Sequence, residues 1–313
     1  MIWVAVAVRI VANPFSNVFQ KLLARQSGKP LVILSVTHAL LSLACAGVFL
    51  FVPMPASREF WTSISICSLL AVAANGLIIQ ALSLSDLSIL GPINAWKPVV
   101  GLVPGMLLLH EYPGGGALCG IALIIAGSYL IVDGGQSDRL KNFRARFLMD
   151  RGIQCRFAAL VLAAIEAVFL KRALQVSSPI ATFVWWSILG FVVSGMAAAA
   201  CLAASRSAAP AGTTASAADD HALRREAAVI STNADTYLLL ALTTGLMQFC
   251  TVITLERLQV GNALALFQIS ALISVFLGRR VFDEPHFLRR LTGAAVMVAG
   301  AALVILGEQR HHG

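Results

Sequence analysis

The residues of this sequence best suited to chemistry are charged side chains inside long apolar runs. Lys97 stands in the middle of GPINAWKPVVGLVPGMLLLHE, positions 91–111, and Glu166 stands in the middle of the apolar run 157–174. At the centre of a bilayer a charged side chain costs about 3 kcal/mol or more, so it normally faces the protein interior and has a partner. We predict that Lys97 binds substrate, with Glu166 as its counter-ion. The alternative is a purely structural ion pair.

A kink beside Lys97 would bring further polar groups to the same place. Asn94 precedes Lys97 by three residues and therefore shares its helical face. Pro98 removes a backbone donor, which frees the carbonyl of Asn94 four residues earlier. Polar backbone at membrane depth is tolerated only against protein or water. The segment therefore predicts a bent helix that presents Asn94 and Lys97 to a substrate cavity.

Glu166 is predicted to help bind the substrate, and it could also move protons. A buried carboxylate near a lysine is balanced between its charged and neutral forms, so we expect Glu166 to accept a proton during transport. The alternative is a structural role, in which Lys171 or a neighbouring helix satisfies the carboxylate.

Amide, imidazole and indole side chains inside the apolar runs are further candidates for substrate binding. They are Asn75, Gln248, His38, Gln268, Asn13, Asn17 and Trp186. Hydrogen bonds between helices are an equally good use of the amides. A place in the aromatic belt at the membrane surface is the alternative for Trp186.

The sequence lacks the common motifs of hydrolytic enzymes, ATP-binding proteins and metal sites. It contains no HExxH, no GxSxG, no pair of aspartates in mid-span and no GxxxxGK[ST]. The six cysteines show neither CxxC pairing nor zinc spacing. We therefore expect no enzyme, no ATP hydrolysis, no cofactor and no metal site.

The composition requires lipid as the main solvent. Of the 313 residues 58% are hydrophobic and only 12% are charged, whereas soluble domains carry about 25% charged residues. The formal charge of +8 comes from short basic runs between apolar segments, which is typical of loops that fix a membrane topology and not of nucleic-acid binding. A membrane helix needs about 20 mostly apolar residues. Ten such spans are predicted, at 2–24, 31–52, 61–83, 87–109, 116–132, 157–174, 180–204, 236–255, 261–278 and 291–307.

The spans form two sets of five that resemble each other. Glu111, Gly120 and Gly127 recur as Glu284, Gly293 and Gly300, a shift of 173 residues that also superposes Asn75 on Gln248. A shift of 150 places Lys21 on Lys171. Because five is odd, two such repeats enter the membrane from opposite sides, as inverted repeats of carriers do. We expect repeats at 1–133 and 157–313, a basic connection at 134–156 and a low-complexity loop at 205–234.

The segments that carry this pattern also resemble a known family. ALSLSDLSILGPINAWKPVVGLVPGMLLLHEYPGGGALCGIALIIAGSYLI and LERLQVGNALALFQISALISVFLGRRVFDEPHFLRRLTGAAVMVAGAALVI are similar to the repeat unit of EamA-like proteins of the drug/metabolite transporter superfamily. The resemblance implies an all-α membrane protein with ten transmembrane helices in two five-helix repeats. It also implies a central cavity lined by the first four helices of each repeat.

The leading prediction is therefore a secondary active transporter for a small polar metabolite, an amino-acid-like compound or a xenobiotic. It would work by alternating access at the midplane of a bacterial inner membrane. The alternative is a flippase for a lipid-linked substrate. A homodimer is compatible with either function. The distribution of basic residues favours both termini outside the cytoplasm, whereas the resemblance implies both inside.

Overall fold

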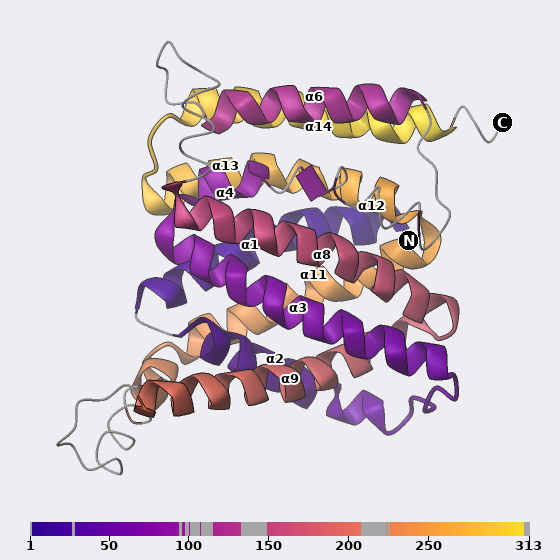
Figure 1. Cartoon of the computed structure of the whole chain (residues 1–313), viewed down its shortest axis with the longest axis vertical. Helices are drawn as coiled ribbons and strands as arrows, with labels where there is room; N and C mark the ends of the chain where they lie inside the picture. The colour runs from indigo at the N-terminus through magenta and orange to yellow at the C-terminus, as the bar shows by residue number, and fades with distance from the viewer. Residues whose placement is uncertain are drawn as a thin grey trace.

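The computed structural model describes residues 2–26, 29–93, 96–97, 100, 107, 115–132, 149–207, 224 and 226–309. Within them the chain is helical and contains no strand (Figure 1). The helices are α1 (Ile2–Arg25), α2 (Pro30–Phe49), α3 (Arg58–Leu84), α4 (Leu87–Ile93), α6 (Gly115–Val132), α8 (Arg151–Gln175), α9 (Pro179–Ser207), α11 (Ala234–Arg257), α12 (Val260–Leu266), α13 (Ser270–Phe282) and α14 (Phe287–Gln309), with a 3₁₀-helix, η3 (Phe267–Ile269), between α12 and α13.

Seven segments of the described chain are long and apolar enough to cross a membrane. They are Ile2–Arg25, Pro30–Phe49, Arg58–Leu84, Arg151–Gln175, Pro179–Ala204, Ala234–Arg257 and Val260–Phe282. Each agrees within a few residues with a predicted span, which confirms an all-α membrane protein. The predicted spans 116–132 and 291–307 correspond to α6 and α14. Most of the predicted span 87–109 lies outside the described residues, so the ten-span arrangement stays a prediction.

One predicted span is broken in the structure. The sequence predicts a continuous helix at 261–278, but η3 interrupts it between α12 and α13. Two side chains compensate for the interruption: Gln268 Nε2 donates to the carbonyl of Leu264 at 2.6 Å, and Ser270 Oγ donates to that of Phe267 at 2.6 Å. Broken helices at membrane depth occur where the freed backbone is buried in protein or lines a cavity.

The start of α8 is fixed by side chains rather than by its apolar pattern. The Asp150 carboxylate accepts hydrogen bonds from the backbone N–H groups of Gly152 and Ile153, at 2.8 and 3.1 Å, which satisfies donors that a helix start leaves free. Ser85 Oγ, at the end of α3, donates to the same carboxylate at 3.0 Å. A Cβ on Gly152 would overlap Ser85. The end of α3 and the beginning of α8 are therefore tied together.

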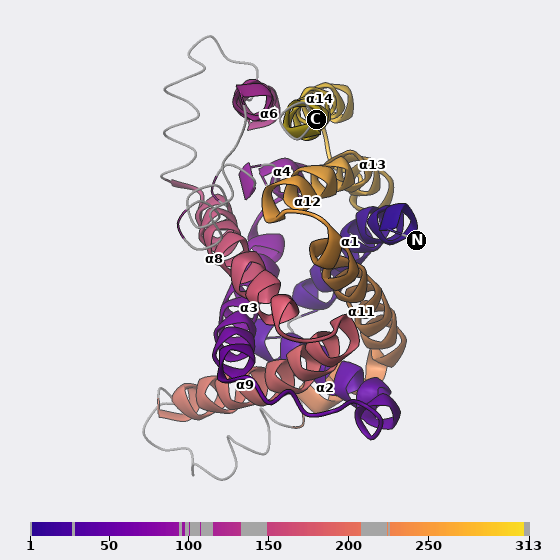
Figure 2. The ribbon, with the colours of Figure 1, turned by 90° about the vertical axis from the view of Figure 1, so that its right-hand side faces the viewer.

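Each helix of the first half packs chiefly against one helix of the second half. The pairs are α1 with α11, α2 with α9, α3 with α8, α4 with α13 and α6 with α14. In both views α6 and α14 lie side by side at one end of the molecule, and α2 and α9 lie at the other end (Figures 1 and 2). The middle is formed by α1, α3, α8, α11 and α12.

Glycines bring α6 and α14 into backbone contact. A Cβ on Gly127 would lie 2.8 Å from the carbonyl oxygen of Gly293, and a Cβ on Gly300 would lie 2.6 Å from that of Gly120. Both distances are too short for a side chain. The glycines of the repeated pattern therefore allow α6 and α14 to approach closely.

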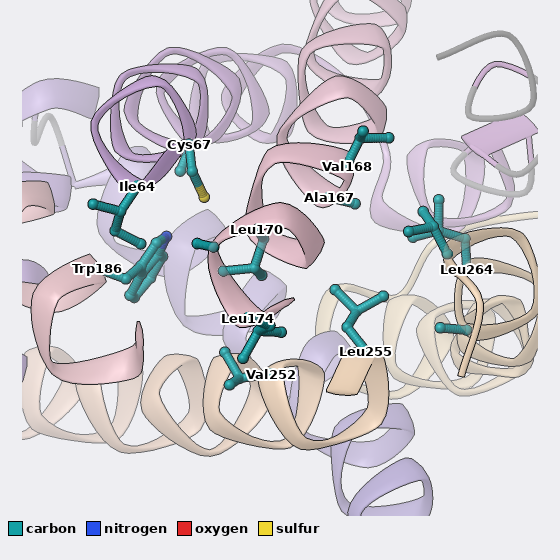
Figure 3. Close-up of a cluster of buried hydrophobic side chains, with 14 of the residues drawn as sticks. Ile64, Cys67, Ala167, Val168, Leu170, Leu174, Trp186, Val252, Leu255 and Leu264 are labelled. Carbon is teal, nitrogen blue, oxygen red and sulfur yellow. The ribbon is translucent and has the colours of Figure 1, made fainter. Parts of the chain in front are cut away.

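An apolar cluster joins α3, α8, α9, α11 and α12 (Figure 3). Ile64 and Cys67 of α3 and Leu170 of α8 point toward Trp186 of α9, and Val252 of α11 lies beside Leu174 (Figure 3). The cluster fixes the helices that carry most of the polar residues described next.

Candidate functional site

A cavity lies between α1, α2, α3, α8, α9 and α11, with Leu264 of α12 and Phe267 of η3 at its edge. Both halves of the chain contribute to its lining. Of the ten side chains predicted to bind substrate, eight line it: Lys97, Glu166, Asn75, Gln248, His38, Asn13, Asn17 and Trp186. Other polar lining residues, among them Ser16, Gln20, Thr37, Thr244 and Thr251, were not named from the sequence, and contact of any of them with a substrate stays a prediction.

Two of the predicted residues stand apart. Asn94 lies outside the described residues. Gln268 is 1% exposed but is not among the lining residues, because its amide nitrogen is used within the broken helix, on the carbonyl of Leu264. The proposed kink beside Pro98 also falls on residues that the structure does not describe.

Lys97 and Glu166 share the cavity without forming an ion pair. Glu166 interacts electrostatically with both Lys97 and Arg9, and its Oε1 accepts from the Cys67 thiol at 3.6 Å. Among the described residues, however, no Lys97–Glu166 salt bridge occurs. The direct counter-ion contact predicted from the sequence is therefore replaced by a longer-range interaction.

Lys171 serves the end of α11 instead of Glu166. Its Nζ donates to the carbonyls of Leu255 and Leu258, at 2.6 and 2.9 Å, where the helix leaves acceptors without partners. This contact fixes α8 against α11 and leaves Glu166 facing the cavity.

Arg9 is a lining residue that the sequence reading missed. Its side chain is buried in α1 at 6% exposure, and its guanidinium carbon lies 3.9 Å from the centroid of the Phe267 ring. Nε and Nη1 have no hydrogen-bond partner among the described residues. The signal was available, since Arg9 interrupts the apolar run 2–24 as Lys97 interrupts 87–109.

Arg156 was assigned to the wrong structural element. The sequence reading placed it in the basic connection 134–156, but α8 begins at Arg151, so Arg156 lies inside the helix. It is 4% exposed, lines the cavity, and donates from Nε to the carbonyl of Leu90 at 3.1 Å. The capping carboxylate of Asp150 moves the start of the helix to a position before the apolar run, which hydropathy alone could not reveal.

The amides and aromatic side chains of the cavity differ in how far they are satisfied. Asn75 Nδ2 donates to the carbonyl of Ala71 at 2.9 Å and Asn13 Nδ2 to Ser270 Oγ at 3.3 Å. Gln248 Nε2 and Trp186 Nε1 have no partner among the described residues. The His38 and Trp186 ring centroids lie 4.8 Å apart. Donors without partners at a cavity wall are available to a ligand.

A second group of charged side chains, around Glu284, has a structural role. Glu284 Oε1 accepts from Lys21 Nζ at 2.9 Å and from the backbone N–H of Leu87 at 2.8 Å, and Arg290 lies 3.5 Å from its other oxygen. Lys21 also donates to the carbonyl of Ser85 at 3.1 Å. The carboxylate thus joins α1, α4 and α14. Glu111, its counterpart in the repeated pattern, lies outside the described residues.

A bundle of apolar helices around a buried polar cavity is typical of a multi-pass membrane protein. Residues 1–133 match the model of the EamA-like transporter family. The resemblance seen in the sequence is thereby confirmed.

The relatives of known name are shorter than this chain. A probable 4-amino-4-deoxy-L-arabinose-phosphoundecaprenol flippase subunit ArnE of Pseudomonas paraeruginosa is 41% identical over 71 residues, which are 23% of this chain and 58% of that protein. The protein of the same name from Pseudomonas aeruginosa is 39% identical over 66 residues, 21% of this chain and 56% of the relative. The region of this chain that matches them thus spans little more than half of the length of each relative.

A solved crystal structure extends the likeness to the whole chain. It superposes with a TM-score of 0.63 over 99% of this chain and 98% of the other, at 13% identity. At that identity the match shows the fold alone. Together with the apolar helices, the family match places the chain among integral proteins of the bacterial inner membrane.

Proposed function

We propose that this chain is a secondary transporter that carries its substrate by alternating access through a cavity between two inverted five-helix repeats. The observation that carries the proposal is the cavity itself, which is buried, polar and lined by both halves of the chain. Sites at a repeat interface can open to either side when one repeat rocks against the other.

The helix packing supports the two repeats. If α1, α2, α3, α4 and α6 correspond to α8, α9, α11, α12–α13 and α14, exchanging the halves maps every main helix pair onto a main helix pair. The glycine contacts obey the same exchange, since Gly127 meets Gly293 and Gly300 meets Gly120.

The two lysines related by the 150-residue shift give an independent argument for the repeats. Lys21 donates to the carbonyl of Ser85, and Lys171, its equivalent under the 150-residue shift, donates to that of Leu258. The acceptors are related by 258 − 85 = 173, the shift that superposes the Glu–Gly–Gly pattern. A contact reproduced between equivalent positions favours a shared ancestral unit over a chance sequence match.

Accessibility from the two sides of the membrane tests alternating access. Asn75→Cys and Gln248→Cys, each in a background without the six native cysteines, would be treated with a charged maleimide in right-side-out and inside-out vesicles. We expect both positions to react from both sides. Leu43→Cys, which is 72% exposed on the outer surface of α2, is the control and should stay unlabelled because lipid covers it. Labelling of both cavity positions from one side only would contradict the proposal.

A lipid-linked substrate is the second candidate, and one observation favours it. An apolar groove of about 720 Å³ lies on the outer side of α2, α9 and α11, which also line the cavity. Phe183 of the groove stacks against Trp186 of the cavity, with ring centroids 6.4 Å apart and an interplanar angle of 19°. A hydrocarbon chain in the groove would leave its polar head beside the cavity. The flippase name of the relatives agrees with this candidate.

A further inference from the structure

Among the described residues that line the cavity, positive and negative charges do not balance. Arg9, Lys97 and Arg156 line it, and Glu166 is the only carboxylate among the described lining residues. Arginine stays charged in proteins, and taking a charge out of water without a partner is costly. An excess of buried positive charge therefore calls for an anion that is not part of this chain.

Arg9 shows where such an anion would bind. Of the two arginines, Arg156 uses its Nε on the carbonyl of Leu90, whereas Arg9 leaves Nε and Nη1 without a partner in the part of the chain that the structure describes. Phe267 covers the Arg9 guanidinium at 3.9 Å, which holds its plane in one orientation. Glu166 acts on Arg9 through space without a hydrogen bond between them.

We propose that the substrate carries an anionic group, a phosphate or a carboxylate, and that Arg9 binds that group directly. This inference rests on the proposed transport function and adds the chemical class of the substrate. Lys97 contributes a second positive charge, while Glu166 opposes the anion and limits how tightly it is held. A carrier needs that limit, because its substrate must leave again.

Thermal unfolding of the purified full-length protein in neutral detergent tests the proposal, since a ligand that binds only the native state raises the melting temperature. The probes are inorganic phosphate, glutamate and dodecyl phosphate. Potassium chloride at equal ionic strength and uncharged dodecanol are the controls. We expect at least one anion to stabilise the wild type beyond its control. Stabilisation by inorganic phosphate or glutamate indicates a soluble substrate, and stabilisation by dodecyl phosphate alone indicates a lipid head group.

Three variants assign the effect to the cavity. Arg9→Gln should abolish the stabilisation, and Arg9→Lys, which keeps the charge but has fewer donors, should weaken apparent affinity on the order of tenfold. Arg172→Gln, at the partly exposed Arg172–Glu59 pair, should leave the stabilisation unchanged. Glu166→Gln should strengthen anion binding on the order of tenfold, because a nearby unit charge contributes about 1–2 kcal/mol at intermediate dielectric. A gain of affinity cannot come from misfolding.

The proposal is overturned if no anion exceeds its control, or if Arg9→Gln binds the anion as the wild type does. Loss of folding in Arg9→Gln would leave Arg9→Lys and Glu166→Gln as the deciding variants. Two-sided maleimide labelling without anion binding would reject this inference but keep the transporter. Anion binding with one-sided labelling would support this inference but reject alternating access.

Discussion

At the scale of single residues, Lys21 and Lys97 of the first half have different roles. Lys21 is 2% exposed and has three oxygen or aromatic neighbours: Glu284 at 2.9 Å, the Ser85 carbonyl at 3.1 Å, and the Phe282 ring at 4.8 Å. Lys97 lines the cavity and interacts with Glu166 only through space. The first arrangement stabilises the fold, and the second leaves a charge available to a ligand.

This difference predicts opposite outcomes for the same substitution. Lys97→Met should change the free energy of unfolding little and should show a coupling energy with Glu166→Gln below about 1 kcal/mol, because no direct contact is broken. Lys21→Met, the matched comparison, should destabilise the protein by about 3–5 kcal/mol, since it leaves the Glu284 carboxylate buried without its lysine. Melting temperatures of the single and double variants in detergent measure both. A strongly destabilised Lys97→Met that Glu166→Gln restores would show a structural ion pair instead.

Residue types predicted the cavity better than they predicted its charge. The amides and Lys97 were recognised because a polar group inside an apolar run is costly wherever it stands. Arg9 obeys the same rule but lies close to the start of the first span, where a basic residue resembles a topology signal. Arg156 was missed because the Asp150 cap, not hydropathy, begins α8.

At the scale of helices, the apolar runs predict where membrane spans lie, but they do not predict where a helix is interrupted. The segment 260–282 contains no proline, yet η3 divides it. Gln268 and Ser270 make this possible by bonding carbonyls that the helix would otherwise satisfy. Such local competition depends on side-chain rotamers, which the sequence pattern does not contain.

The contact between α6 and α14 depends on glycine at defined positions. Gly127→Ala should lower the free energy of unfolding by about 1–3 kcal/mol, because its Cβ would meet the Gly293 carbonyl at 2.8 Å and the Met297 backbone nitrogen at 2.9 Å. Gly47→Ala in α2, where a Cβ meets nothing within 4 Å, should be neutral or stabilising by up to about 1 kcal/mol through helix propensity. Thermal unfolding of the two variants provides the comparison. Equal effects would mean that α6 and α14 can separate without cost.

At the scale of the whole molecule, the relative position of the two termini depends on whether the number of membrane crossings is even or odd. The beginning of α1 and the end of α14 lie on the same side of the molecule, at the right in Figure 1 and toward the viewer in Figure 2. An even number of crossings has this consequence, whereas the seven candidate spans alone would place the termini on opposite sides. The additional crossings would come from α6, α14 and the segment that contains Lys97.

A reporter fused to either end can therefore decide between ten spans and an odd number. We expect a fluorescent protein that folds only in the cytoplasm and a phosphatase that works only outside it to give the same side for both termini. Reporters on opposite sides would contradict the inverted five-helix repeats, because two odd repeats always sum to an even number of crossings. The side on which both termini lie decides between two predictions: the basic loops place the termini outside the cytoplasm, and the family resemblance places them inside. Arg156 no longer counts among those loops, since α8 buries it, but the other basic residues still favour termini outside the cytoplasm.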